Sequence, residues 1–359
     1  MRAVRKSMSN FAELIAASLG SERFSLLDIG CSGGIDPRWR VFGARLKALG
    51  IDASKAECAR LTAAESNAGI EYVAAFAAEA SDAKLEVKQA SPLIFQIRDR
   101  LSFMRTTELR EARLGKAETE EKLRHNAWEM TELADRTKPV VVPELLGQRG
   151  WTDLDYLKID IDGSDFRVLQ TFDGTFESLG VLGVQLEVNF VGTDAPTEHA
   201  FHNTDRFMRR QGYELFRLDV RTYSSRALPA RYVWPTPAET VSGRPFQGEA
   251  YYARDVAAPG LSAAKRAKLA AIFALWDVPD LAAELLVAHR DTLVPLFNVA
   301  AGLDLLAAQQ QPDRTRKLDY KTYLASFEAD DRWFYRREGN IGLGERLAAA
   351  WQAFRRPRK

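Results

Sequence analysis

The sequence predicts an α/β fold built on a parallel sheet, and three observations support this prediction. An apolar segment at residues 24–30 runs directly into a glycine-rich turn, as buried strands of such sheets often do. Strand-like and helix-like segments then alternate over residues 24–77, which is typical of parallel strands joined by helical crossovers. Further apolar segments of strand length return as far as residue 253.

The first elements follow from local patterns. Residues 10–20 place apolar side chains at helical spacing and stop at Gly20, a residue type that commonly ends helices. Residues 53–68 are rich in alanine and also have helical spacing. Strands are expected at residues 24–30, 48–52 and 70–77.

The middle of the chain has a different character. Residues 105–136 are dense in Arg, Glu and Lys, which predicts a solvated helix within an inserted helical cap at about residues 85–146. The prolines of residues 229–245 indicate a long irregular loop. Strands are expected to resume at residues 154–161, 181–188, 213–220 and 249–253.

These elements divide the chain into three parts. Residues 1–22 form an N-terminal helix, residues 23–257 form the sheet domain with its cap insertion, and residues 258–359 form a C-terminal α-helical region. Pro259-Gly260 marks the end of the sheet domain, and we interpret the basic residues 355–359 as a disordered end.

Composition excludes several function classes. The 359 residues carry 50 Lys and Arg against 49 Asp and Glu, a net charge of +1, whereas a dedicated nucleic-acid binder is usually strongly basic. Two cysteines and four histidines leave little material for a disulfide framework, a zinc cluster or a histidine-rich metal site. No apolar run has the length of a membrane span, and Glu13 interrupts the N-terminal apolar stretch. We therefore expect a cytoplasmic enzyme.

The glycine-rich turn is the first candidate site. The segment Asp28–Gly34 reads Asp-Ile-Gly-Cys-Ser-Gly-Gly, and its glycines let the backbone turn sharply and approach a ligand closely. Asp52 ends the next predicted strand, where an acid commonly binds the ribose of a nucleotide-like cofactor. A turn that uses glycine for chain geometry alone is the alternative.

The turn disfavours a dinucleotide. The spacing of Gly30, Gly33 and Gly34 does not match Gly-x-Gly-x-x-Gly, and Asp28 would put a carboxylate beside phosphates. An acid at this position suits a cationic or zwitterionic ligand better. S-adenosylmethionine has a sulfonium, an ammonium and a ribose but no phosphate, so we predict it as the cofactor.

The motifs resemble those of a known family. Asp28–Gly34 is similar to the first motif of class I S-adenosylmethionine-dependent methyltransferases. Leu157–Gly163, which reads Leu-Lys-Ile-Asp-Ile-Asp-Gly and continues to Asp165, resembles the signature of the FkbM-type branch. Residues 184–187 and 212–216 resemble two later strands of that branch, so the likeness covers roughly residues 24–255.

Two residues depart from the family pattern. Ser32 stands where many methyltransferases have glycine, and Asp162 stands where the FkbM-type branch usually has glutamate. The resemblance implies a Rossmann-like class I methyltransferase sheet that is mostly parallel with an antiparallel edge strand. It implies that the methionine end, the ribose and the adenine of the cofactor contact Asp28, Gly30, Cys31, Ser32, Gly34, Asp52, Ala53, Phe76, Ala77 and Asp160.

Acids at strand ends are the catalytic candidates. The resemblance puts Asp160 beside the reacting methyl group, and Glu187 and Asp162 lie at the same predicted edge. Each of these acids could instead cap a helix or bind a loop. His199 and His202 are the imidazole candidates for a base, although we interpret them as an exposed surface pair. The three acids could hold Mg²⁺, but we expect no metal.

We therefore predict an S-adenosylmethionine-dependent methyltransferase that O-methylates a sugar, a glycan, a glycolipid or a natural product. The alternatives are an NAD-dependent nucleotide-sugar oxidoreductase and a non-catalytic methyltransferase fold whose C-terminal helices act as a scaffold. Cys31 is expected to be a packing residue rather than a nucleophile. An acceptor-binding loop or simply solvated arginines would explain the cluster of Arg217, Arg221, Tyr223, Ser224, Ser225 and Arg226.

Overall fold

The structure is a computed structural model that describes residues 2–81, 83, 138–161, 164–223, 244–310 and 318–329. The proline-rich loop, the charged segment 105–136 and most of the predicted cap insertion lie outside these residues, as do the basic residues 355–359. In the described part of the chain, no helix is both long and apolar enough to cross a membrane.

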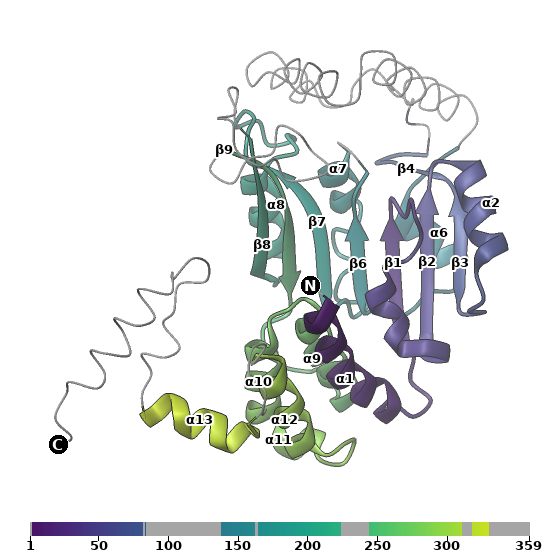
Figure 1. Ribbon diagram of the computed structural model, residues 1–359. Helices are drawn as coiled ribbons and strands as arrows, with labels where there is room; N and C mark the ends of the chain where they lie inside the picture. Colours follow the sequence, from purple (N-terminus) through teal and green to yellow (C-terminus); the bar gives the residue numbers. More distant parts are fainter. Residues whose placement is uncertain are drawn as a thin grey trace, which may run out of the picture.

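A seven-stranded sheet organises the described residues, with strand order β3-β2-β1-β6-β7-β9-β8 (Figure 1). Its strands are β1 Phe24–Ile29, β2 Leu46–Asp52, β3 Ile70–Ala74, β6 Tyr156–Ile159, β7 Gly183–Asn189, β8 Glu214–Tyr223 and β9 Arg244–Ala253. The strands from β3 to β7 pair in parallel, and β9 is antiparallel to both β7 and β8. This confirms the predicted mostly parallel sheet with an antiparallel end, where the reversed strand lies between β7 and β8.

The crossover after β1 differs from a regular α/β unit. The glycine-rich turn leads into η1 (Pro37–Arg45), a 3₁₀ segment interrupted at Gly43, whose φ is +53°. A regular helix, α2 (Lys55–Ala64), appears only after β2, where the Ser54 side chain accepts a hydrogen bond from the Glu57 N–H and caps it. After β3, the short β4 (Phe76–Ala77) pairs with β5 (Pro139–Val140) outside the main sheet.

Helices cover the two faces of the sheet and build two cores. The face that we call the first face packs against α1, η1, α2 and the C-terminal helices, whereas the second face packs against the helices that follow β5, β6 and β7. The helices on the first face are α1 Arg2–Ser18, α9 Ala263–Leu275, α10 Pro279–Ala288, α11 Arg290–Leu293 and α12 Val299–Gln309. The helices on the second face are α6 Val142–Gln148, α7 Asp165–Gln170 and α8 Phe201–Arg210, and α13 (Tyr320–Ala329) follows α12.

The C-terminal helices share their core with the sheet. Helix α9 is buried along most of its length, and a Cβ atom on Gly183 of β7 would lie 3.2 Å from both Ile272 and Trp276. Helix α1 contacts both α9 and α12, and these helices lie together beside the amino ends of the parallel strands (Figure 1). The opposite end of the sheet, to which the arrows of β1, β2 and β6 point, therefore lies far from this helical layer.

A buried ion cluster joins α9 to the sheet. The Asp155 carboxylate is completely buried just before β6 and accepts a hydrogen bond from the Ser25 N–H at 2.8 Å. The same carboxylate lies 2.7 Å from the Lys265 ammonium and 3.0 Å from that of Lys268, and Lys268 is also buried. Both carboxylate oxygens are thus paired, which satisfies a charge that would otherwise be costly to bury.

Candidate functional site

Glycine is required at different positions of the turn for different structural reasons. At Gly30, with φ +86°, a Cβ atom would lie 1.8 Å from the carbonyl oxygen of Asp160, so the close approach of β6 requires glycine. At Gly34 a Cβ atom would press on Leu61 and on the Tyr72 hydroxyl. Only Gly33 of these three has no atom within 4 Å of the equivalent position, so it is the glycine that leaves room for a ligand.

The backbone N–H groups of the turn are largely used within the protein. The N–H groups of Gly30 and Cys31 both donate to Ile51 O, and that of Gly34 donates to Cys31 O. The Gly33 N–H donates to Glu57 Oε1 at 2.9 Å, and the Ile35 N–H donates to Tyr72 Oη. A phosphate bound at such a turn needs free N–H groups and the N-terminus of a helix. Here the next element, η1, begins with the carboxylate of Asp36 accepting from the Arg38 N–H. The turn therefore lacks the usual features of a pyrophosphate site.

Two carboxylates share one ammonium at the carboxyl end of β1 and β6. Lys158 Nζ lies 3.3 Å from Asp28 Oδ1 and 3.3 Å from Asp160 Oδ2. Burial raises the pKa of Asp28 to about 6, although the Lys158 charge opposes this rise. Burial lowers the pKa of Lys158, but its two acidic neighbours outweigh that effect and raise it overall. Two carboxylates paired with one ammonium give this group one net negative charge when all three side chains are ionised.

The structure brings the predicted cofactor residues to one edge of the sheet. The Asp160 N–H donates to Ile29 O just before Gly30, and Asp52 follows Ile51, the partner of Ile29 in β2. Asp52 Oδ1 accepts from the Ser54 N–H at 2.8 Å. Of the others, Ser32 is exposed, Ala53 and Phe76 are half-buried, and Ala77 is buried in β4. Asp162 lies outside the described residues.

The Cys31 thiol is a packing group. Its side chain is buried, and burial raises the pKa of the thiol far above its usual range. A thiol that stays protonated is a poor nucleophile. The burial of the side chain agrees with the prediction that Cys31 is a packing residue.

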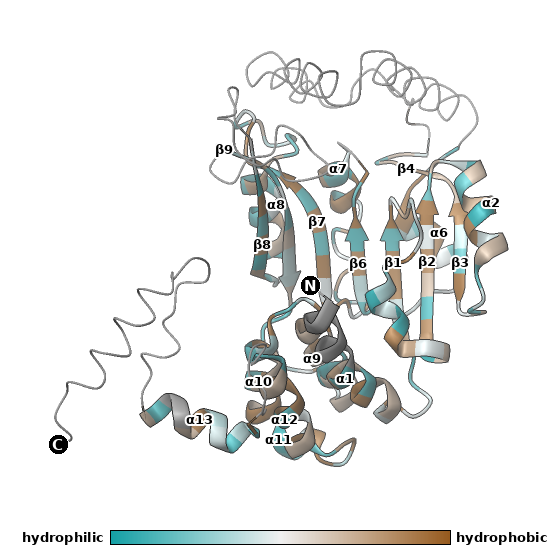
Figure 2. Ribbon diagram, in the orientation of Figure 1, coloured by the Kyte–Doolittle hydropathy of each residue, from teal (hydrophilic) through white to brown (hydrophobic). Residues whose placement is uncertain are grey.

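The catalytic candidates Asp160 and Glu187 lie on neighbouring strands, with further polar residues that sequence reasoning missed. Glu187 of β7 is buried and faces Glu249 across the β7–β9 pair. Arg221 of β8 lies 3.7 Å from the carboxylates of both glutamates. Gln185, two positions before Glu187, donates to Glu249 Oε2 at 3.0 Å. The signal was present in the sequence, because polar residues alternate with apolar ones in strands that should be buried on both faces. Figure 2 shows such mixing in β6 and β8.

His199 corrects the interpretation of an exposed histidine pair. Its ring is buried, with Nε2 2.9 Å from Glu187 O and Nδ1 3.7 Å from Asp165 Oδ2. Helix α8 begins only at Phe201, so His199 precedes the helix and does not share a face with His202. His202 is exposed, as expected.

The arginines of β8 are more engaged than simple solvated side chains. Arg217 lies over the Tyr251 ring at 5.4 Å, pairs with Asp219 at 2.9 Å and donates to the Trp276 carbonyl. Of the two alternatives for this cluster, the simply solvated side chain does not describe Arg217. Ser224, Ser225 and Arg226 lie outside the described residues, so an acceptor-binding role for that loop stays a prediction.

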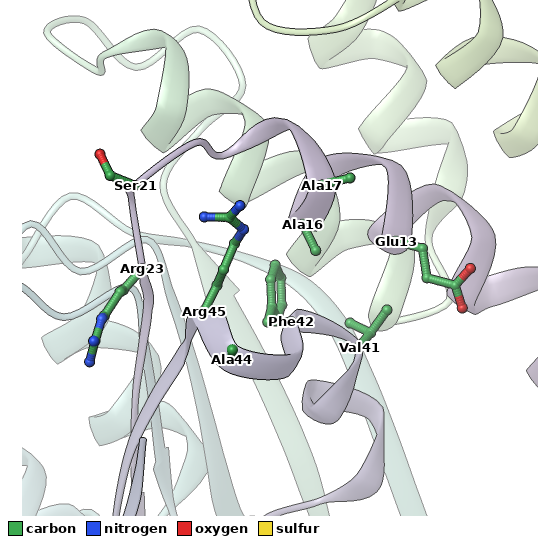
Figure 3. A pocket seen from close by; sticks show the side chains of 9 residues that line it. All are labelled: Glu13, Ala16, Ala17, Ser21, Arg23, Val41, Phe42, Ala44 and Arg45. Atoms are coloured by element: carbon green, nitrogen blue, oxygen red, sulfur yellow. The ribbon is translucent and has the colours of Figure 1, made fainter. Parts of the chain in front are cut away.

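Two other features lie apart from this edge. Among the residues that the structure describes, no group of three or more His, Cys, Asp or Glu side chains is arranged to hold a metal ion. An open hollow of about 530 Å³ lies between α1, the start of β1 and η1, with Phe42 and Arg45 projecting toward α1 (Figure 3). It is lined by Glu13, Ala16, Ala17, Ser21, Arg23, Val41, Phe42, Ala44 and Arg45, none of which was predicted to bind cofactor.

Comparison with protein families gives a likeness over the middle of the chain. Residues 57–215 match the profile of the methyltransferase FkbM domain. The chain carries an FkbM methyltransferase domain. The matched segment contains β6, β7 and the Leu157–Gly163 motif, and it begins after the glycine-rich turn. The FkbM assignment makes the protein an S-adenosylmethionine-dependent methyltransferase, so that coarse prediction is confirmed.

Solved structures give weaker likenesses. A magnesium protoporphyrin IX methyltransferase from Synechocystis PCC 6803 with bound S-adenosylmethionine is 6% identical, with a TM-score of 0.29 over 71% of this chain and 81% of that one. A putative tRNA (m1A22) methyltransferase from Streptococcus pneumoniae is 10% identical, with a TM-score of 0.26 over 84% of this chain and 97% of that one. Among curated proteins, none matches the chain. The fold assignment of the FkbM protein therefore depends on its own strand order.

Proposed function

We propose that this FkbM protein transfers a methyl group from S-adenosylmethionine to a hydroxyl group of a sugar, glycan, glycolipid or natural product. The observation that carries the cofactor part is the carboxyl edge of β1 and β6, where Asp28 and Asp160 share the single ammonium of Lys158. An edge with one net negative charge favours a cationic ligand and disfavours a phosphate. The internal use of the turn N–H groups supports the same choice over NAD.

The residues of this edge fit the parts of the cofactor. S-adenosylmethionine supplies an activated methyl group on a positively charged sulfur. Asp28 and Asp160 offer negative charge to its cationic methionine end, and the open side of Gly33 leaves room beside them. Asp52 at the end of β2 is the acceptor for ribose hydroxyls, and Phe76 and Ala77 in β4 are the candidates beside the adenine.

The acceptor part follows from the chemistry of methyl transfer. Because the reaction is an in-line displacement, alignment of the two reactants and exclusion of water supply much of the rate. A hydroxyl group also needs a base for its proton, and the carboxylates of Asp160 and Glu187 lie at this same edge. A net charge of +1 favours a small molecule or glycan over nucleic acid as the acceptor.

Calorimetric titration with S-adenosylmethionine tests the cofactor assignment. We expect binding by the wild type and at least tenfold weaker binding by Asp28→Asn, because that change removes the negative charge of Asp28. The exposed acid Glu214, changed to Gln, is the matched control and should bind like the wild type. Absence of binding by a well-folded wild-type chain would sink the proposal, and fluorescence quenching by NADH would favour the oxidoreductase.

A mass-spectrometric panel tests the acceptor assignment. Glycans, lipid-linked sugars and polyketides are incubated with the protein and the cofactor, and a gain of one methyl group identifies the acceptor class. The deletion of everything after Gly260 does not separate catalysis from a scaffold role, because α9 is part of the core beneath the sheet. The point variants above test the two roles without removing that core.

A further inference from the structure

We propose that Glu249 of β9 receives the proton of the acceptor hydroxyl, and that a hydrogen-bond chain from the C-terminal helices holds its carboxylate in position. This inference rests on the methyl transfer proposed above. The hydrogen-bond chain begins at Trp276 and ends at Glu249, and both residues lie outside the segment 57–215 that matches the FkbM domain. The proposed role of Glu249 therefore rests on the contacts in this protein and not on the family match.

The chain crosses the first face of the sheet from α9 to β9. Trp276 Nε1–H, just after α9, donates to the Tyr156 hydroxyl of β6 at 3.0 Å. The Tyr156 hydroxyl donates to Gln185 Oε1 of β7 at 2.8 Å. Gln185 Nε2–H in turn donates to Glu249 Oε2 at 3.0 Å. Four side chains from three strands and one helix end thus form a continuous line that finishes on a carboxylate.

The direction of this chain is set at its first member. An indole N–H can only donate, so the Tyr156 hydroxyl accepts from Trp276 and must offer its own hydrogen to Gln185. Trp276 and Tyr156 are both completely buried, and burial raises the pKa of Tyr156 well above its usual value, so the hydroxyl keeps its hydrogen. The amide of Gln185 must then turn its NH₂ group toward Glu249. As a result Oε2 of Glu249 is held as an acceptor, and Oε1 is left to take up a proton.

The surroundings of Glu249 make its carboxylate a stronger base. Burial raises the pKa of Glu249, Asp160 raises it further, and Gln185, Lys158 and Arg221 oppose the rise. Arg221 Nη2 lies 3.7 Å from Oε1, Glu187 faces it on β7, and Asp219 faces it on β8. The side chain remains 15% exposed, against 6% for Glu187. A carboxylate whose pKa lies above the ordinary range is a better proton acceptor at physiological pH.

The position of Glu249 leaves space for the reacting groups. Only β7 separates β6 from β9, and Glu249 pairs with Glu187 of β7, which is level with Asp160 just after β6. Because neighbouring strands lie about 4.8 Å apart, the backbones at Asp160 and Glu249 are roughly 10 Å apart. An acceptor over β7 would lie between Asp160 and Glu249. Its oxygen forms the new bond to the methyl carbon while the methyl–sulfur bond breaks and leaves its electron pair on sulfur. The hydroxyl proton moves to Glu249 Oε1 and then to water.

A titration of glutamate carboxyl groups by carbon-13 NMR tests this role without an acceptor. The Glu249 resonance is assigned by its loss in Glu249→Gln, and we expect its pKa to lie above the usual value. In Gln185→Met, which keeps the side-chain length but removes the N–H donor, the midpoint should rise by about one pH unit. Trp276→Phe removes only the indole N–H and should shift the midpoint by less, in the same direction. An ordinary pKa for Glu249, or one that does not respond to Gln185→Met, would overturn the inference.

Binding and turnover separate this inference from the proposed function. Glu249→Gln should bind S-adenosylmethionine like the wild type, and Glu214→Gln should leave the Glu249 titration unchanged. If the wild type binds no S-adenosylmethionine, both proposals fail. If it binds the cofactor while Glu249 titrates ordinarily, only this inference fails. With the acceptor that the panel identifies, Glu249→Gln should lower kcat by about 10²–10⁴-fold and leave KM for the cofactor unchanged. A wild-type kcat would contradict the role.

Discussion

Asp155 and Asp28 lie at opposite ends of the sheet and are both buried, yet their charges are balanced differently. At the amino end, the Asp155 carboxylate has two lysine ammonium groups and a backbone N–H within 3.0 Å. At the carboxyl end, Asp28 shares its one lysine with Asp160, at 3.3 Å to each. The first carboxylate is fully satisfied by the protein, whereas the second belongs to a group with an excess negative charge.

The difference separates stability from binding. A carboxylate whose partners all come from the protein joins two elements, here α9 and the start of β6. A buried carboxylate with too little positive charge around it lowers the free energy of unfolding, and a bound cation restores that free energy. The same sheet therefore carries a stabilising ion cluster at one end and a candidate ligand site at the other.

The largest expected effect concerns the amino end. Asp155→Ala leaves the ammonium of Lys268, which is 1% exposed, without its buried partner. Removal of one member of a buried ion pair costs about 3–5 kcal/mol in the free energy of unfolding. Urea denaturation measures this loss. The neighbouring Asp153 also binds Lys265 but is 45% exposed, so Asp153→Ala should cost less than about 1 kcal/mol. Equal losses in the two variants would contradict the contrast between the two ends.

The second effect concerns pH and the carboxyl end. Burial holds the pKa of Asp28 at about 6, above its usual value, so acid removes the negative charge of Asp28 below that pH. Affinity for S-adenosylmethionine should accordingly fall by up to about tenfold for each pH unit below 6 and level off above it. Calorimetric titrations with S-adenosylmethionine at several pH values between about 5 and 8 measure this dependence of affinity on pH. Asp28→Asn should bind S-adenosylmethionine more weakly, with an affinity that does not change with pH. Equal affinity of the wild type at all these pH values would contradict a role of the Asp28 charge in binding.

Lys158 sharpens the same comparison. Lys158→Met removes the charge that opposes the rise in the pKa of Asp28, so the midpoint of the affinity profile should move upward by about one pH unit. Lys158→Arg keeps a cation and should stay near the wild-type midpoint. The same calorimetric series measures both variants. A shift in Lys158→Arg as large as that in Lys158→Met would show that the ammonium shape, rather than its charge, matters.

The smallest expected effect concerns the two histidines near this edge. His199→Ala removes a buried ring that contacts Glu187 O and Asp165, which should cost about 1–2 kcal/mol of unfolding free energy. His202→Ala changes an exposed side chain and should stay within about 0.5 kcal/mol of the wild type. Thermal or urea unfolding distinguishes the pair. A larger loss for His202 would reverse the burial assigned to these two residues.

Local patterns in the sequence predicted the elements that depend on local physics. The strands expected at residues 24–30 and 181–188 correspond to β1 and β7, and the alanine-rich segment became α2. The glycine-rich turn was expected because Gly30 must accept a positive φ, a requirement that local sequence records. The 3₁₀ segment η1 was missed, since its kink at Gly43 and its packing of Trp39 and Phe42 against β1 depend on the surrounding core.

The sequence by itself determined the parallel sheet, the acidic turn and the FkbM motif, because these depend on the order of residues along one strand or turn. Only the tertiary structure decided which charges meet. Lys158 stands between Asp28 and Asp160, and Trp276 reaches Glu249 through Tyr156 and Gln185, because strand order brings together residues that are 130 and 120 positions apart in the chain. Pairing across a sheet depends on topology and register, which no local pattern encodes.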